Sequence, residues 1–157
     1  MSLFTIFQIA SQGMSAQRER LEAATSNLAN AHTTRTAEGG PYRRRDVIFE
    51  TIVVEEPRPT FGEALNSLFP QGSVFPGPQA SPQGVQSTSR LAPANEVTMR
   101  YQPDHPDADA NGYVALPDVD PLEETVNMIS AARSFEANAT AFNTAKEMAR
   151  ASIKLGE

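Results

Sequence analysis

The sequence predicts a mainly α-helical protein with a small β region, in which long N- and C-terminal helices pack as a coiled-coil-like pair. Apolar residues recur at both ends of the 157-residue chain in alternating steps of four and three positions, which is the spacing of a helical seam. The middle contains a stretch rich in β-branched and aromatic residues. A segment dense in proline and glycine follows it. We therefore expect a small antiparallel β element and a Pro-rich loop between the two helices.

The N-terminal helix is expected to run from residue 3 to about residue 30. Ser2 suits the N-cap position, and Asn30 begins a run of cap, β-branched and turn residues that cannot continue a helix. At ~1.5 Å per residue this helix would be ~42 Å long. Its seam has one polar member, Gln17, and consists of Leu3, Phe7, Ala10, Met14, Gln17, Leu21, Ala24, Leu28 and Ala31.

The C-terminal helix has the clearer start signal. Asp120 can cap it, Pro121 suits the first helical position because its missing N–H has no helical partner there, and Glu123 can close a capping box. Basic residues gather towards its far end, where they complement the negative pole of the helix dipole. Its seam also has one polar member, Lys146, and consists of Met128, Ala132, Phe135, Ala139, Phe142, Lys146, Ala149 and Ile153.

The middle of the chain supplies the β element. Residues 42–55 have strand composition, and residues 96–102 and 112–116 are short candidate partners. Residues 57–94 hold seven of the twelve prolines and are expected to form a loop or arm, with a short helix at 61–69. We therefore divide the chain into an N-terminal helix (1–34), a β-containing middle (35–119) that includes the arm, and a C-terminal helix (120–157).

Composition excludes several functional classes. The absence of cysteine rules out disulfides, thiolate zinc sites and a cysteine nucleophile. A net charge of −6 argues against nucleic acid as the main ligand, because phosphate binding needs clustered Lys and Arg. No apolar run approaches the ~20 residues that a membrane span needs, and the first residues lack the basic start of a signal peptide. We expect a soluble chain whose export, if any, needs no cleaved leader.

No catalytic, cofactor or small-molecule site is expected. His32 and His105 each lie in a predicted turn without triad partners, and no phosphate-binding glycine loop is present. Three adjacent arginines, Arg43, Arg44 and Arg45, would point to alternate faces of a strand, so we expect a solvated or interfacial edge. The sequence therefore predicts that this protein is not an enzyme.

Residues 107–118 resemble an EF-hand calcium loop. Acidic and amide residues occupy its positions 1, 3, 5 and 12, with glycine at position 6: Asp107, Asp109, Asn111, Asp118 and Gly112. Pro103, Pro106 and Pro117 block the flanking helices that such a loop requires. We favour an Asn-Gly turn feeding a strand and expect no metal, with a small calcium-binding protein as the alternative function.

The two seams have a second interpretation, an ordinary two-helix core inside one globular domain. Further apolar residues lie off both seams, so a simple helical hairpin would leave apolar strips exposed: Phe4, Ile6, Ile9, Leu122, Val126, Ile129 and Leu155. Such strips favour packing against further helices. We therefore expect assembly with other chains, and a generic coiled-coil adaptor remains another alternative.

Three segments resemble the flagellar rod and hook axial proteins. Residues 24–36 (ATSNLANAHTTRT) are similar to the Asn-rich signature near their N-termini. Residues 105–149 and the opening SLFTIFQIASQGMSAQRERL are similar to basal-body rod proteins of this family. The resemblance implies a non-catalytic subunit of the proximal rod in the periplasmic space, which transmits motor torque and is exported by the flagellar type III system without a cleaved signal.

The same resemblance implies the partners. They are copies of the chain itself, other proximal and distal rod proteins, the basal-body membrane ring and the export apparatus. Asn27 and Asn30 are expected to shape the end of the first helix and its contacts. The residues that we expect to carry subunit packing are Leu3, Phe7, Ala10, Met14, Leu21, Ala24, Asn27, Leu28, Asn30, Met128, Ala132, Phe135, Ala139, Phe142, Ala149 and Ile153.

Overall fold

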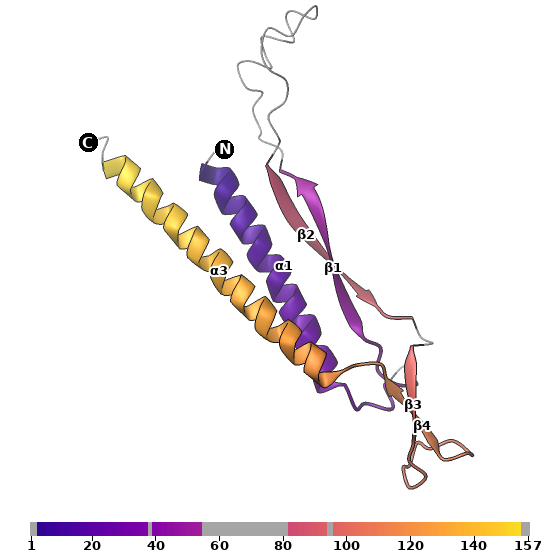
Figure 1. Cartoon of the computed structure of the whole chain (residues 1–157). Coiled ribbons are helices and arrows are strands. Elements are labelled where there is room, and N and C mark those ends of the chain that lie inside the picture. Colours follow the sequence, from indigo (N-terminus) through magenta and orange to yellow (C-terminus); the bar gives the residue numbers. More distant parts are fainter. Residues whose placement is uncertain (1–2, 38, 55–81, 94–95, 155–157) are drawn as a thin grey trace, which may run out of the picture.

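The computed structural model describes residues 3–37, 39–54, 82–93 and 96–154. Two long helices lie side by side, a two-stranded sheet flanks one of them, and a second two-stranded sheet lies beyond one end of the helix pair (Figure 1). The predicted fold class, helix-rich with small antiparallel β elements, is confirmed. In chain order the elements are α1 (Leu3–Ala29), β1 (Arg45–Val53), β2 (Gln83–Leu91), β3 (Val97–Tyr101), β4 (Tyr113–Pro117) and α3 (Pro121–Lys154).

The start of α3 follows its sequence signals. The Asp120 carboxylate accepts the backbone N–H of Leu122 at 2.8 Å, which makes Asp120 the predicted cap, and the helix begins at Pro121. Glu123 was expected to close a capping box. Its carboxylate instead accepts a hydrogen bond from Arg44 at 3.0 Å, because the chain before β1 brings that guanidinium to the first turn of α3. The predicted cap of α1, Ser2, lies outside the described residues.

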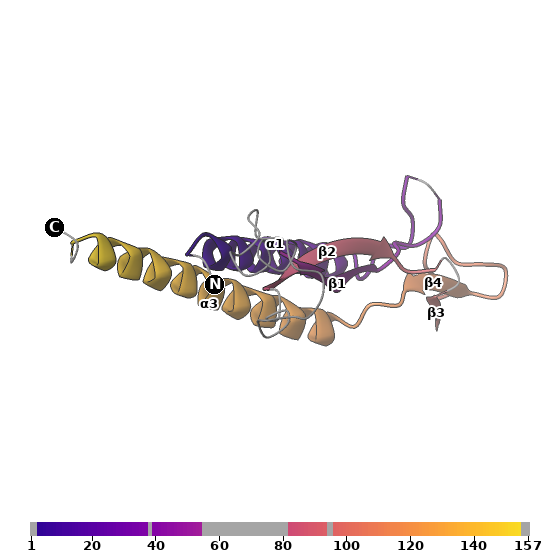
Figure 2. The ribbon, with the colours of Figure 1, turned by 90° about the horizontal axis from the view of Figure 1, so that it is seen from above.

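The two helices run antiparallel and touch along their length. The rings of Phe7 and Phe142 lie 4.9 Å apart near one end of the pair, and the Thr25 hydroxyl lies 3.8 Å from the Met128 sulfur near the other. Between them Gly13 permits close approach, since a Cβ there would lie 2.9 Å from the Asn138 amide nitrogen. At 34 residues α3 is longer than the 27-residue α1, and its C-terminal end projects past the start of α1 (Figure 2).

The β1–β2 pair corrects one part of the sequence prediction. β1 pairs antiparallel with β2 in a nine-residue ladder from Arg45↔Leu91 to Val53↔Gln83. The interpretation of residues 57–94 as loop or arm was therefore wrong for residues 83–91. That strand (QGVQSTSRL) is mostly polar and exposed, so its own sequence lacks a core-facing pattern, and pairing with β1 and packing on α1 fix its conformation. The short helix expected at 61–69 lies outside the described residues.

The second sheet also differs from the expected one. β3 and β4 pair with each other, from Val97↔Pro117 to Tyr101↔Tyr113, and the described residues form two separate two-stranded sheets. The two strands lie close in sequence, which makes their mutual pairing the shorter connection. Within the described part of the chain, neither long helix contains the apolar stretch that crossing a bilayer requires.

The turn before β4 has the predicted Asn-Gly conformation. The Asp109 carboxylate accepts the backbone N–H groups of Asn111 and Tyr113 at 2.9 and 2.8 Å, and Gly112 has a φ of +79°. This carboxylate oxygen is therefore engaged in holding the turn. Asp107 accepts a hydrogen bond from the Thr34 hydroxyl at 2.8 Å. The alternative of a calcium-binding protein is not supported.

Candidate functional site

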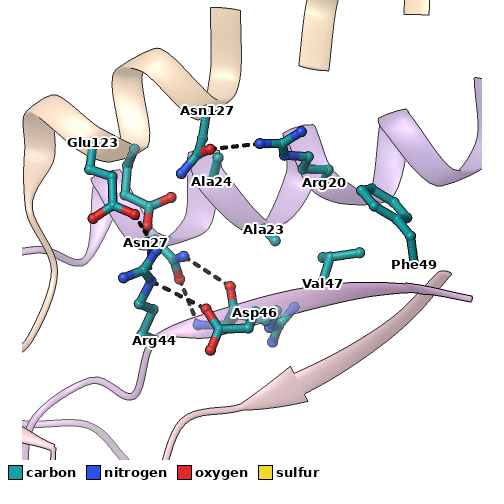
Figure 3. Close-up of a pocket in the computed structure, with 12 residues that line it drawn as sticks. Arg20, Ala23, Ala24, Asn27, Arg44, Asp46, Val47, Phe49, Glu123 and Asn127 are labelled. Atoms are coloured by element: carbon teal, nitrogen blue, oxygen red, sulfur yellow. Dashed lines mark hydrogen bonds and ion pairs between the residues drawn. The ribbon is translucent and has the colours of Figure 1, made fainter. Parts of the chain in front are cut away.

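Asn27 ties the C-terminal part of α1 to the start of β1. Its side chain is 1% exposed. The amide nitrogen donates to the backbone carbonyl of Arg45 at 3.0 Å, and the amide oxygen accepts the backbone N–H of the same residue at 2.8 Å (Figure 3). The Tyr42 hydroxyl donates to that oxygen as well, at 3.0 Å. Because the amide satisfies both backbone groups at the end of the strand, α1 and β1 are held in one fixed arrangement.

An ion cluster joins the same region to α3. The Arg44 guanidinium lies 3.0 Å from the Glu123 carboxylate and 3.1 Å from that of Glu124, and its Nε is 3.3 Å from the Asp46 carboxylate (Figure 3). The Arg44 Nε and the Glu124 Oε1 are buried and form no aligned hydrogen bond, so their contact is an ion pair. The cluster links the first turn of α3 to the chain before β1 and to Asp46 of β1, and we call it the clamp.

The clamp changes the ionisation of its buried carboxyl. Burial raises the pKa of Glu124, and the hydrogen bond with Asn27 and the charge of Arg44 oppose that rise only in part. For Arg44, burial lowers the pKa, but the hydrogen bond with Glu123 and the surrounding carboxylates outweigh it, so the net pKa is raised. Arg44 therefore remains charged, while Glu124 is a carboxyl of the clamp whose pKa is raised.

We expect Glu124→Gln to alter the pH dependence of stability. Since the native pKa of Glu124 lies above the unfolded value of about 4.3, the native state binds more protons between the two values. The contribution of this carboxyl to the free energy of unfolding therefore falls as pH rises through that window. Urea unfolding at several pH values from about 4 to about 7 measures the free energy of unfolding of both chains. As pH rises over this range, the stability of the Glu124→Gln variant relative to wild type should increase. Glu123→Gln is the matched control, and an equal shift in both variants would contradict the assignment to Glu124.

The interpretation of Arg43–Arg45 as a solvated or interfacial edge was wrong for Arg44, which is partly buried in the clamp. Arg43 also has a specific role, since its guanidinium donates to the Ala92 carbonyl beyond β2. No local signal in the sequence separates Arg44 from its neighbours. Two acidic residues in the first turn of α3, Glu123 and Glu124, could have suggested a basic partner. They identify Arg44 only when the fold is known to place that turn beside β1.

A close contact between α1 and β2 fixes the position of the first sheet. A Cβ on Gly84 would lie 1.9 Å from the Gln12 side-chain oxygen and 3.0 Å from a methyl of Val54. The Ser87 hydroxyl donates a hydrogen bond to the Glu19 carboxylate, two turns further along α1 than Gln12. Gly84 is therefore a position at which β2 lies too close to the helix for a side chain to fit without a shift, and the sequence alone did not single it out.

We expect Gly84→Val to destabilise the chain by about 1–3 kcal/mol, because the added side chain must displace Gln12 and Val54 or lift β2 from α1. Denaturant unfolding monitored by circular dichroism measures the change. Ser89→Val is the matched control, since Ser89 is an exposed residue of the same strand. Equal unfolding midpoints for the two variants would contradict this packing.

The predicted packing residues divide into three groups. Ala10, Ala24 and Asn27 are buried within the single chain, and Phe135 and Ile153 are exposed. The side chain of Leu3 lies outside the description. The remaining members are half-buried: Phe7, Met14, Leu21, Leu28, Asn30, Met128, Ala132, Ala139, Phe142 and Ala149. Their contribution to packing between subunits stays a prediction.

An apolar row on α3 faces away from α1. Leu122, Val126 and Ile129 are spaced by four and three residues, so they share one face of the helix, and all three are exposed. We call them the outer row. Phe4 near the start of α1 and Met148 near the end of α3 are exposed as well. Contiguous exposed apolar residues mark interaction surfaces, which makes the outer row the candidate assembly interface.

Two segments of the chain match known protein families. Residues 7–35 match the family described as "Flagella basal body rod protein", and residues 110–155 match "Flagellar basal body rod FlgEFG protein C-terminal". The flagellar basal-body rod protein FlgC of Borreliella burgdorferi is 38% identical over 161 residues, which cover 99% of this chain and 98% of that protein. The proteins of the same name from Salmonella typhimurium and Bacillus subtilis are 36% and 34% identical, with 100% of each chain covered.

Proposed function

Because this chain belongs to the family of the flagellar basal-body rod protein FlgC, we propose that it joins neighbouring rod subunits through α1 and α3 and so passes motor torque along the rod. The chain is a structural subunit of the bacterial flagellar rod and not an enzyme. It resides in the basal body and assembles with other rod proteins.

The observation that carries the proposed role of the helices is the exposed outer row. Val126 at its centre is 58% exposed in the single chain. Among the residues that the structure describes, the buried apolar ones are small, since eight of the ten are alanines and the other two are valines. Helices that bury mainly small apolar side chains within one chain gain stability when neighbours cover their exposed rows. Burial of the outer row between subunits would supply that missing core.

The position of the chain within the rod and its partners outside the rod are also part of the proposal. We place the chain in the proximal rod within the periplasmic space, in contact with the membrane ring and the export apparatus. Export through the flagellar type III system fits a chain whose packing depends on neighbours, because such a chain unfolds at low cost before it passes a narrow channel. The three-part division into residues 1–34, 35–119 and 120–157, and the packing residues given above, belong to the same proposal.

Electron microscopy of basal bodies from a strain deleted for this chain tests the role. We expect loss of the rod, hook and filament while the membrane ring persists, and recovery of all three on complementation. Intact flagella in the deletion strain would contradict a rod function. They would instead favour a coiled-coil adaptor, which should form a discrete soluble oligomer.

A further inference from the structure

The β3–β4 hairpin is attached to the rest of the molecule at few points. It lies beyond one end of the helix pair, and no Cα atom of β3 or β4 is within 8 Å of a Cα atom of α1, α3, β1 or β2 (Figure 1). Val114 of the hairpin is fully buried, whereas Met99, Tyr101 and Tyr113 are exposed. A two-stranded sheet of five-residue strands is marginally stable alone. Contacts outside the strands therefore decide whether the hairpin stays in place.

One side chain makes the polar contacts between the hairpin and the rest of the described chain. Asp107, in the loop between β3 and β4, accepts a hydrogen bond from the Thr34 hydroxyl at 2.8 Å, and its other carboxylate oxygen lies 4.0 Å from the Arg35 guanidinium. Both partners lie in the segment that follows α1. Apart from bonds with the adjoining residues 118 and 119, no other hydrogen bond or ion pair joins residues 97–117 to the remainder of the described chain. We call Thr34, Arg35 and Asp107 the latch.

On the side of α3, Val119 is the point about which the hairpin can turn. Asp118 belongs to the hairpin, since its carboxylate accepts a hydrogen bond from the Thr98 hydroxyl at 3.4 Å. Asp120 belongs to α3, because its carboxylate caps the helix by accepting the N–H of Leu122. Hinges are a few residues at the ends of elements that absorb a change in backbone angles, and Val119 lies between these two held residues.

The latch is more exposed to solvent than the clamp. The Arg35 and Asp107 side chains are 77% and 31% exposed, whereas the Glu124 side chain of the clamp is 3% exposed. An exposed ion pair contributes little, so the hydrogen bond from Thr34 to the charged carboxylate is the main tie. The first sheet and the helices are joined through Asn27 and the clamp, which do not involve the hairpin. Loss of the latch should therefore leave them in place.

We propose that the latch holds the β3–β4 hairpin against the segment after α1, and that the hairpin opens about Val119 as one unit when this contact is lost. Such local opening is expected of a unit with few buried apolar residues. The helix pair and the β1–β2 sheet then form the fixed part of the chain. In the latch, the two segments 24–36 and 105–149 meet in the folded molecule. This inference goes beyond the proposed rod role and does not depend on it, since the motion takes place within one chain.

Hydrogen exchange of the purified full-length chain, followed by mass spectrometry of its peptides, tests the latch. In Asp107→Ala we expect the backbone amides of β3 and β4 to exchange at least tenfold faster than in wild type, because a hydrogen bond to a charged group is lost. The amides of α1 and β1 should keep their rates. Asp104→Ala is the matched control, since it removes an exposed carboxylate of the same loop. Equal hairpin exchange in Asp107→Ala and wild type would overturn the proposal, as would an equal rise in α1, which would indicate loss of the whole fold.

The distance between two spin labels tests the motion itself. The chain contains no cysteine, so labels attach only at the introduced Arg100→Cys on β3 and Ser130→Cys on α3, both exposed positions. With the latch intact we expect one narrow distance distribution. Thr34→Val removes the same hydrogen bond while Asp107 stays, and it should add a second distance or broaden the first. The pair Ser89→Cys and Ser130→Cys, which joins β2 to α3, should not change. A hairpin distance that Thr34→Val leaves unaltered would overturn the hinge.

Discussion

Replacement of Val126 by aspartate is expected to abolish rod assembly while leaving the single chain folded. Val126 lies in the centre of the outer row and is exposed in the monomer, so the change should alter the free energy of unfolding by no more than about 0.5 kcal/mol. If the outer row is buried between subunits, the same carboxylate becomes an unpaired charge in an apolar contact, which costs several kcal/mol. An association weakened by a hundredfold or more would block rod growth.

The measurement is complementation of the deletion strain, scored by swimming in soft agar and by electron microscopy of basal bodies. Asn143→Asp is the matched control, because it adds the same charge at an exposed position of α3 about four turns beyond the outer row. Circular dichroism of both purified variants verifies that the helices are intact. Normal rods in the Val126→Asp strain would contradict the assignment of the outer row to the assembly interface.

Asn27→Leu is expected to destabilise the chain by about 2–4 kcal/mol, the largest effect that we expect on the fold itself. The substitution keeps a side chain of similar size but leaves the N–H and carbonyl of Arg45, which are partly buried against α1, without their side-chain partner. It also removes the acceptor of the Tyr42 hydroxyl and a hydrogen bond that supports the Glu124 carboxylate. Buried polar groups that lose their partners carry the full cost of desolvation.

Urea unfolding of the purified chain measures this loss. Asn143→Leu is the matched control, since Asn143 is exposed on α3, and its replacement should change stability by no more than about 0.5 kcal/mol. A similar unfolding midpoint for both variants would show that Asn27 does not hold α1 to β1. A smaller loss for Asn27→Leu at low pH than at neutral pH would indicate that Glu124 shares the same cluster.

The two helices could be predicted from the sequence because helix caps and helical periodicity depend on residues close together in the chain. Asp120 caps α3 and Pro121 is its first residue, as their chemistry predicts. Phe7 of the N-terminal seam also packs on Phe142 of the C-terminal seam. The contact on α3 is shifted in part, since Ala131 and Ala145 are buried whereas Ala132 and Ala139 are half-buried. The buried residues of α3, Glu124, Ala131 and Ala145, still follow a seven-residue repeat, so the contact face is displaced by one residue from the predicted seam.

Features that depend on distant segments could not be predicted in the same way. β2 is polar and exposed, and its strand conformation comes from pairing with β1 and packing on α1. The role of Arg44 depends on the start of α3, 79 residues away in the chain. Gly84 is singled out by its distance from Gln12, which only the folded arrangement reveals. In each case the interaction joins residues that are far apart in the sequence, and the residues next to them in the chain do not indicate it.

The central claim is that neighbouring subunits bury the outer row in the assembled rod. A Val126→Cys chain tests it directly, because no other cysteine is present and the thiol can be labelled with a maleimide in the free chain and in isolated basal bodies. We expect at least tenfold slower labelling in basal bodies, with full labelling after the rods are dissociated. Equal labelling rates in the free chain and in intact rods would contradict the claim.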